Sequence, residues 1–151
     1  MGRYAEPLAT VFAAFAGVDA KAKVLDVGCG PGALTAHLLS IGADVAAIDP
    51  SPPFVDTVRK CFPGVDVRQG VAEELPWEAS AFDAALAQLV VHFMNDAVAG
   101  IREMARVTRL GGIVAACVWD GPTGALETTQ MALADAAAAD HEERRLSHEG
   151  K

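Results

Sequence analysis

The sequence is short of basic residues and of long apolar runs, and each shortage excludes a class of protein. Its 12 Lys and Arg are outnumbered by 20 Asp and Glu, and the resulting net charge of -8 would repel a phosphate backbone. We therefore expect no nucleic-acid partner. No apolar run approaches the roughly 18 residues of a membrane span, and the N-terminal segment has no secretory-signal pattern. The sequence therefore predicts a cytoplasmic protein without a membrane partner.

Cysteine is too sparse and too scattered to build a cross-linked or metal-bound scaffold. Cys29, Cys61 and Cys117 form no Cys-x-x-Cys pair, and no histidine stands at ligand spacing from them. We therefore expect neither a disulfide framework nor a metal site. Cys29 lies inside a glycine-rich loop, but no histidine near it in the sequence could activate its thiol, so it is not expected to act as a nucleophile.

What the sequence does contain is a regular alternation of apolar runs and amphipathic segments. Hydrophobic residues make up 52% of its 151 residues, enough to bury one core, so a single domain is expected. Short apolar runs bounded by glycine or polar residues predict strands, and apolar residues at spacings of three and four predict helices. The predicted strands are 23–27, 44–48, 65–69, 82–89 and 113–119, and the predicted helices are 4–16, 33–41, 53–61 and 96–108.

Strands that alternate with helices predict a doubly wound, mainly parallel α/β sheet of about five strands. In such a sheet ligands bind at the carboxyl ends of the strands, where the strand order reverses beside the first strand. The predicted core spans residues 1–120. Residues 121–151 are predicted to form a C-terminal tail of the same domain, helical over 125–146 and fraying toward its polar end.

A glycine-rich turn follows the first predicted strand directly. The run VLDVGCGPG at residues 24–32 places Gly28, Gly30 and Gly32 at alternate positions, where the missing side chains let the backbone turn tightly and approach a ligand. The next predicted helix points its free amide groups and the positive end of its dipole into the same place. The turn is therefore a predicted ligand-binding element.

Two aspartates narrow the choice of ligand. Asp49 ends the second predicted strand, where its carboxylate can accept hydrogen bonds from both hydroxyls of an adenosine ribose. The turn also fits the dinucleotide fingerprint Gly-x-Gly-x-x-Gly/Ala through Gly28, Gly30 and Ala33, so the turn alone does not name the cofactor. Asp26 favours S-adenosylmethionine, because its carboxylate can reach an ammonium group directly or through water, whereas a pyrophosphate would gain nothing from it.

Later segments, taken in order, resemble one family. They are VLDVGCGPG at 24–32, AIDPS at 47–51, GVAEELPW at 70–77, FDAALAQLVVHF at 82–93 and REMARVTRLGG at 102–112. This series over residues 3–120 resembles the class I S-adenosylmethionine-dependent methyltransferases of the small-molecule, type 11-like kind. The resemblance implies a Rossmann-like fold, S-adenosylmethionine as co-substrate, and methyl transfer to a small-molecule acceptor by in-line displacement.

The resemblance also implies which residues hold the cofactor. The glycine turn holds the methionine part, the position of Asp49 binds the ribose, its two successors border the adenine, and the segment 71–73 reaches the adenine edge. The family commonly has Asp at the position of Val71, so here the Ala72 backbone N–H is the group expected to serve the ring. The predicted cofactor residues are Asp26, Gly28, Cys29, Gly30, Gly32, Asp49, Pro50, Ser51, Ala72, Glu73 and Gln88.

Gln88 and His92 are the candidate residues of the acceptor pocket. They lie at and just after the end of the fourth predicted strand, where the methyl group should point. No fixed catalytic residue is required, because methyl transfer can rest on proximity and alignment. For His92, packing or substrate contact is favoured over a role as general base.

Two alternative functions stay open at the level of the sequence. An NAD(P)-binding oxidoreductase is disfavoured, because Tyr4 is the sole tyrosine and no Tyr-x-x-x-Lys pair occurs. A truncated, non-catalytic S-adenosylmethionine-binding domain is the second alternative, because the family normally continues with a helix and an antiparallel hairpin that this sequence is predicted to lack. Without the hairpin, strand 113–119 would be an exposed apolar edge through which the chain could form a homodimer.

Overall fold

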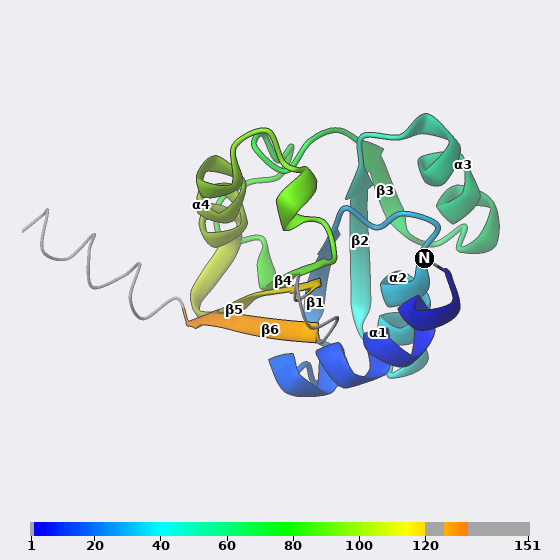
Figure 1. The fold of residues 1–151 in the computed structure, drawn as a ribbon, viewed down its shortest axis with the longest axis horizontal. Helices are drawn as coiled ribbons and strands as arrows, with labels where there is room; N and C mark the ends of the chain where they lie inside the picture. Colours follow the sequence, from blue (N-terminus) through cyan, green and yellow to red (C-terminus); the bar gives the residue numbers. More distant parts are fainter. Residues whose placement is uncertain (1, 120–125, 133–151) are drawn as a thin grey trace, which may run out of the picture.

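A computed structural model describes residues 2–119 and 126–132, and its elements follow the predicted alternation closely (Figure 1). The differences at most predicted boundaries are one or two residues. The elements are α1 (Gly2–Ala16), β1 (Lys23–Val27), α2 (Ala33–Ser40), β2 (Asp44–Asp49), α3 (Pro52–Cys61), β3 (Asp66–Gln69), β4 (Phe82–Gln88), the 3-10 turn η1 (Val91–Phe93), α4 (Ala97–Val107), β5 (Thr108–Trp119) and β6 (Leu126–Ala132).

The strands form one sheet in the order β3-β2-β1-β4-β5-β6. Strands β1 to β5 are parallel, which confirms the predicted doubly wound sheet, and β6 runs antiparallel to β5. The chain leaves β1 toward β2 and β3, then returns to β4 on the other side of β1. The carboxyl ends of β1 and β4 therefore flank the point where the strand order reverses, the usual ligand position in such sheets.

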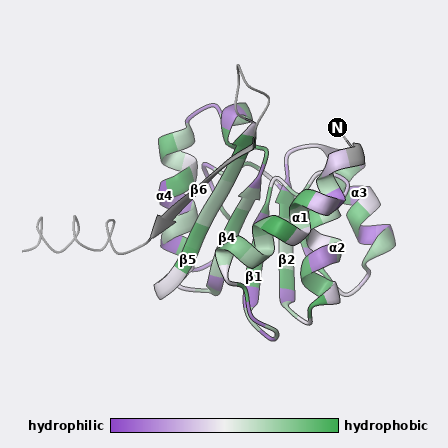
Figure 2. Cartoon of the chain, turned by 60° about the horizontal axis from the view of Figure 1, so that its bottom comes forward, coloured by the Kyte–Doolittle hydropathy of each residue, from purple (hydrophilic) through white to green (hydrophobic). Residues whose placement is uncertain are grey.

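Helices cover both faces of the sheet. Alternate residues of a strand point to opposite faces, so Val24 packs against α1 and α2 while its neighbour Leu25 packs on the side of α4. Because both faces are covered, the central strands are almost continuously hydrophobic (Figure 2). None of the helices in the described ranges has the length and apolar character needed to cross a membrane.

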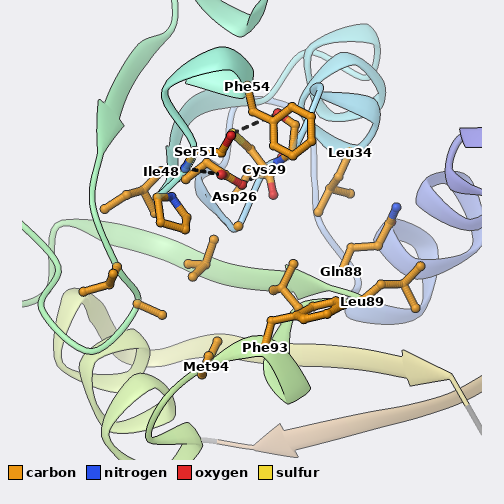
Figure 3. A pocket seen from close by; sticks show the side chains of 18 of the residues that line it. Asp26, Cys29, Leu34, Ile48, Ser51, Phe54, Gln88, Leu89, Phe93 and Met94 are labelled. Carbon is orange, nitrogen blue, oxygen red and sulfur yellow. Dashed lines mark hydrogen bonds between the residues drawn. The ribbon is translucent and has the colours of Figure 1, made fainter. Parts of the chain in front are cut away.

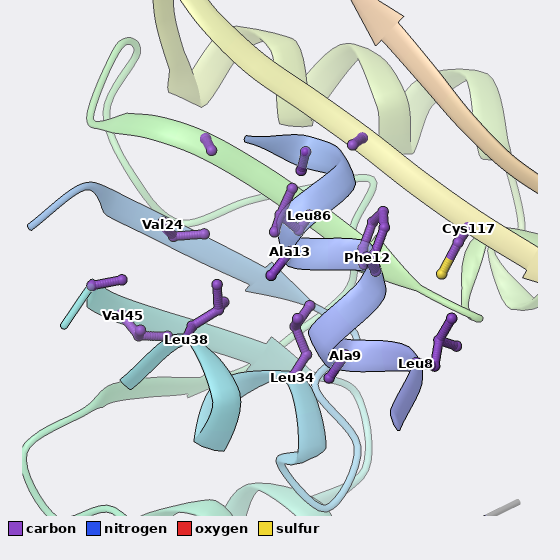
Figure 4. Close-up of a cluster of buried hydrophobic side chains, with 14 of the residues drawn as sticks. Leu8, Ala9, Phe12, Ala13, Val24, Leu34, Leu38, Val45, Leu86 and Cys117 are labelled. Carbon is purple, nitrogen blue, oxygen red and sulfur yellow. The ribbon is translucent and has the colours of Figure 1, made fainter. Parts of the chain in front are cut away.

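The largest core cluster lies between α1, α2 and the sheet. Leu8 and Phe12 project from the inner face of α1, and Phe12 is only 1% exposed. They belong to one cluster with Leu34 and Leu38 of α2, and in Figure 4 Leu8 lies beside Cys117 of β5 while Ala9 lies beside Leu34. This packing holds α1 across the sheet next to the carboxyl end of β4, where its residue Ala5 reaches the ligand cavity described below.

The start of β5 is irregular. Phe82 of β4 pairs with Thr108, but the next pairing is between Ala84 and Ile113, so the intervening β5 residues outnumber those opposite them. Gly111 and Gly112, which separate the predicted helix 96–108 from the predicted strand 113–119, therefore lie inside β5. A Cβ atom at Gly112 would lie 2.5 Å from the Asp83 carbonyl oxygen, which explains why glycine occupies this close approach.

The predicted open edge of β5 is wrong. β6 pairs with β5 along its whole regular length, from Ile113 opposite Ala132 to Trp119 opposite Leu126. Residues 126–132 thus form a strand where a helix was predicted, because an apolar edge with unpaired backbone groups is a strong template for pairing. The expected homodimer stays a prediction, although the edge through which it was expected to form is paired with β6. The rest of the predicted tail, 121–125 and 133–151, lies outside the described residues.

Candidate functional site

A cavity of about 560 Å³ opens at the carboxyl ends of β1, β2 and β4, beside the reversal of strand order (Figure 3). This volume falls within the range of about 300–1,000 Å³ typical of small-molecule sites. Its walls are mostly apolar, with a few carboxylate and amide groups among them. The predicted cofactor residues that line it are Asp26, Gly28, Cys29, Gly30, Asp49, Pro50, Ser51, Ala72, Glu73 and Gln88.

The glycine turn follows β1 and is hydrogen-bonded to the end of β2. The backbone N–H groups of Gly28 and Cys29 both donate to the Ile48 carbonyl oxygen, at 2.8 and 3.0 Å, which ties the turn to the end of β2. Gly28 has φ +72°, and a Cβ atom there would lie 2.7 Å from Val90 Cγ1. Both the backbone angle and the contact with Val90 require glycine.

Gly32 is the one predicted cofactor residue that does not line the cavity. It is the N-cap of α2 with φ +96°, and a Cβ atom there would lie 3.1 Å from the Phe62 ring. The structure therefore gives Gly32 a role in packing α2 close to the end of α3.

Cys29 lines the cavity, but its thiol is unsuited to nucleophilic attack. Burial raises its pKa well above the usual range, and the carboxylates of Asp26 and Asp49 raise the pKa further. The thiol is therefore protonated at neutral pH, in line with the sequence prediction. Within residues 2–119 and 126–132, no group of three or more His, Cys, Asp or Glu side chains is placed to hold a metal ion.

Asp26 is a buried carboxyl group with one unused oxygen. The side chain is 1% exposed, and its Oδ2 accepts a 2.6 Å hydrogen bond from the Thr35 hydroxyl. Its Oδ1 has no hydrogen-bond partner among the described residues. Burial raises the pKa of Asp26 to about 7, the Thr35 hydrogen bond opposes the rise, and the nearby Asp49 carboxylate adds to it. A cationic ligand group at Oδ1 would satisfy the unpaired oxygen and favour the ionised form.

Asp49 joins the loop after β1 to the loop after β2. Its Oδ2 accepts from the Gly30 N–H at 2.9 Å, and its Oδ1 accepts from the Ser51 N–H at 2.8 Å. A carboxylate offers about four lone-pair positions, so each oxygen can still accept one further hydrogen bond. The carboxylate is thus held rigidly, with capacity left for a ligand that carries two neighbouring hydroxyl groups.

The segment after β3 is fastened to the start of α4. Glu73 Oε1 accepts from the Asp96 N–H at 3.0 Å, and this hydrogen bond lowers the pKa of Glu73. A Cβ atom at Gly100 of α4 would lie 2.5 Å from Met94 Sδ and 3.4 Å from Ala72 Cβ. Both Met94 and Ala72 line the cavity. The absence of a side chain at Gly100 therefore lets them pack against α4 and leaves the cavity wider.

The two predicted acceptor-pocket residues are placed differently. Gln88 lines the cavity, and its Nε2 donates to the Ala5 carbonyl oxygen at 3.1 Å. Its Oε1 is buried without a hydrogen-bond partner in the described part of the chain. His92 is exposed, does not line the cavity, and packs its ring on Phe93 with 4.2 Å between the ring centroids. The structure brings Gln88 into the site and leaves His92 outside it.

Several apolar residues line the cavity that the sequence did not indicate. These residues lie on elements other than the glycine turn. Phe54 carried a usable signal, because it lies beside the core positions Val55 and Val58 of α3 and is 43% exposed. An aromatic ring off the core face of an amphipathic helix is a candidate ligand contact. The cavity residues missed in this way are Ala5, Leu34, Ile48, Phe54, Leu89, Val90, Phe93 and Met94.

Comparison with known proteins identifies a matching family and several relatives. The model of a family described as a methyltransferase domain matches residues 25–116. An uncharacterized methyltransferase of Mycobacterium tuberculosis is 42% identical over 90 residues, which cover 60% of this chain and 37% of that protein. The ubiquinone biosynthesis O-methyltransferase of Methylocella silvestris is 37% identical over 96 residues, covering 61% of this chain and 38% of that protein. The chain thus spans well under half the length of these relatives.

Solved structures share the fold. The YcgJ protein of Bacillus subtilis superposes with a TM-score of 0.68 at 23% identity, over 73% of this chain and 49% of that one. The [4+2]-cyclase SpnF superposes with a TM-score of 0.70 at 29% identity, over 75% of this chain and 44% of that one.

Proposed function

Since the chain belongs to the methyltransferase-domain family, we propose that it binds S-adenosylmethionine in the cavity and transfers the methyl group to a small-molecule acceptor. The observation that carries the proposal is the pair of buried carboxyl groups, Asp26 and Asp49, on either side of the glycine turn. When bound, S-adenosylmethionine would supply a methyl group on a sulfonium sulfur, which departs as a neutral thioether.

Asp26 suits the methionine end of this ligand. An unpaired oxygen on a buried carboxyl group costs free energy that a hydrogen-bonding cation would recover. The α-ammonium group of the methionine part is such a cation, and Oδ1 of Asp26 is the atom available to it. The Thr35 hydroxyl keeps the carboxyl group oriented by holding Oδ2.

Asp49 suits the ribose. Its two oxygens are fixed by the Gly30 and Ser51 N–H groups, and each has one acceptor position left. Two neighbouring ribose hydroxyls would match these positions. A dinucleotide ribose would match them as well, so the choice of S-adenosylmethionine over NAD(P) rests on Asp26 and on the family.

The chain contributes alignment to the reaction. The carboxyl groups would fix the two ends of the ligand, and the apolar walls of the cavity at the carboxyl ends of β1 and β4 would shield the reacting groups from water. Holding both reactants in line can lower the activation free energy substantially, without any acid or base catalyst. Among the predicted residues, Gln88 would orient the acceptor.

Replacing Asp49 with Ala should weaken binding of S-adenosylhomocysteine by at least about 100-fold, because two charge-assisted hydrogen bonds are lost. Isothermal titration measures the change, and thermal unfolding checks that the variant is folded. Asp44→Ala is the matched control, because Asp44 is exposed at the other end of the same strand. If the unaltered chain bound neither S-adenosylmethionine nor S-adenosylhomocysteine, or bound NAD in their place, the proposal would be lost. Release of S-adenosylhomocysteine in the presence of acceptors measures turnover separately.

Replacing Gly100 with Ala should weaken S-adenosylhomocysteine binding about tenfold while the helix itself becomes no less stable. The new methyl group would displace the Met94 side chain toward the cavity, since the two would otherwise be 2.5 Å apart. Glycine-to-alanine changes inside helices normally stabilise them, so the two effects have opposite signs. The double variant Gly100→Ala, Met94→Ala should recover the affinity. Unchanged binding by the single variant would show that Gly100 does not set the position of this wall.

A further inference from the structure

One end of the cavity is built differently from the end that holds the two carboxyl groups. Ala5 of α1, Leu34 of α2 and Leu89 after β4 form an apolar wall there, with Phe93 beside Leu89. Figure 3 shows Leu34, Gln88 and Leu89 together next to α1, away from Ile48. Gln88 brings the one side-chain amide to this end of the described cavity wall.

The Gln88 amide has a fixed orientation and a free acceptor. The Ala5 carbonyl oxygen can only accept, so the 3.1 Å hydrogen bond holds Nε2 against α1 and turns Oε1 away from it. Oε1 is buried and has no partner in residues 2–119 and 126–132. A buried carbonyl oxygen without a donor is unfavourable, so a ligand that brings an O–H group would be stabilised there.

The backbone next to Gln88 is held in an unusual conformation. Leu89 has φ +62°, in the left-handed region that branched residues rarely adopt, and its N–H donates to the Cys117 carbonyl oxygen at 2.8 Å. Leu89 is only 8% exposed and packs in the core. Strained backbone of this kind gathers at binding sites, where surrounding packing enforces it. Here it fixes Gln88 and Leu89 side by side at the cavity wall.

Charge and hydrophobicity limit what can enter this end. No Lys, Arg or His side chain lines the described cavity, so a carboxylate or phosphate on the acceptor would lose its hydration there without gaining a basic partner. Phe93 lines the cavity and is still 66% exposed, which leaves an aromatic surface uncovered at this end.

We propose that this end of the cavity binds an uncharged, hydrocarbon-rich methyl acceptor whose hydroxyl group donates a hydrogen bond to Gln88 Oε1. The inference rests on the proposed function and adds the chemical class of the acceptor. The apolar body lies against Leu89 and Phe93, and the hydroxyl group meets the unpaired Oε1 atom of Gln88. Acceptors with an acidic group next to the methylated atom are disfavoured.

Three small probes distinguish these features in protein saturated with S-adenosylhomocysteine. p-Cresol has the apolar body and the hydroxyl group, 4-methylanisole has the body without the donor, and 4-hydroxybenzoate has the hydroxyl group with a negative charge. NMR titration should give dissociation constants about tenfold lower for p-cresol than for either of the others. Gln88→Leu should bring the ratio of the dissociation constants of p-cresol and 4-methylanisole to about one. Phe93→Ser should weaken the binding of both probes. Leu110→Ser is the control, because Leu110 is exposed outside the cavity.

The outcomes separate this inference from the function on which it rests. Equal binding of p-cresol and 4-methylanisole, tightest binding of 4-hydroxybenzoate, or an unchanged ratio in Gln88→Leu would each overturn the acceptor class while S-adenosylhomocysteine still binds. Failure of S-adenosylhomocysteine to bind would appear before any probe is added, and would overturn the proposed function itself.

Discussion

Replacing Asp26 with Asn should make the protein more stable at pH 8 and at the same time unable to bind S-adenosylhomocysteine tightly. The carboxyl group has a pKa of about 7 in the fold, raised by burial from 3.8. Between about pH 4 and pH 7 the unfolded chain therefore releases a proton that the folded chain retains, and the free energy of unfolding falls as the pH rises. Asparagine removes this loss, which is about 4 kcal/mol for a pKa raised from 3.8 to about 7.

Ligand affinity should depend on pH in the opposite sense to the free energy of unfolding, and should rise as the pH rises. In the unaltered protein, a ligand ammonium group should favour ionised Asp26, so affinity should fall by up to about tenfold per pH unit below pH 7. The Asn variant should bind weakly and with little dependence on pH over this range. Urea unfolding and isothermal titration at pH 5, 6, 7 and 8 test both statements.

A ligand without the amino-acid part provides the control. Methylthioadenosine retains the ribose and adenine but carries no ammonium group, so Asp26→Asn should hardly change its binding. If Asp26→Asn weakened both ligands equally, Asp26 would act by shaping the turn and would not be the partner of the ammonium group. Asp44→Asn, at an exposed position, should change neither stability nor affinity.

Replacing Gly28 with Ala should lower the free energy of unfolding by about 3 kcal/mol and abolish ligand binding. The added methyl group would lie 2.7 to 2.9 Å from three carbon atoms of Val90. The residue also has φ +72°, which favours glycine. Urea unfolding measures the first effect, and titration with S-adenosylhomocysteine measures the second.

Gly30 offers a matched control for the backbone contribution. It has φ +52°, but a Cβ atom there would meet nothing within 4 Å. Gly30→Ala should therefore destabilise the fold by only about 1 kcal/mol. Adding Val90→Ala to Gly28→Ala should recover part of the lost stability. Equal destabilisation by the two glycine substitutions would mean that the contact with Val90 contributes nothing.

The elements and the polar half of the site could be predicted because their signals are local. A buried parallel strand is a short apolar run, and Asp26 and Asp49 lie on or at the end of such runs, where chemistry is expected. The apolar half could not be predicted in the same way. Leu34 and Leu89 line the cavity and also belong to the core, so their pattern along the chain is that of ordinary packing residues.

Long-range pairing accounts for the other differences. The hydrogen bond between Gln88 and Ala5 joins residues 83 positions apart, and no local pattern announces it. Residues 126–132 precede a run rich in alanine, which favoured the helical prediction, yet Thr128 and Thr129 are β-branched and suit a strand. The edge of β5 decided the outcome, because its backbone groups needed partners.

The two buried aspartates differ in how freely they could be redesigned. The Asp49 carboxylate connects two loops through hydrogen bonds from the Gly30 and Ser51 N–H groups without any ligand present. The same carboxylate would bind the ligand, so it contributes to both the fold and recognition. A substitution there alters both at once. Asp26 accepts the Thr35 hydrogen bond with Oδ2 and leaves Oδ1 without a partner, so no loop contact is lost when Oδ1 alone is changed, as in Asp26→Asn. An engineer changing the ligand preference of this domain would therefore begin at Asp26 and leave Asp49 in place.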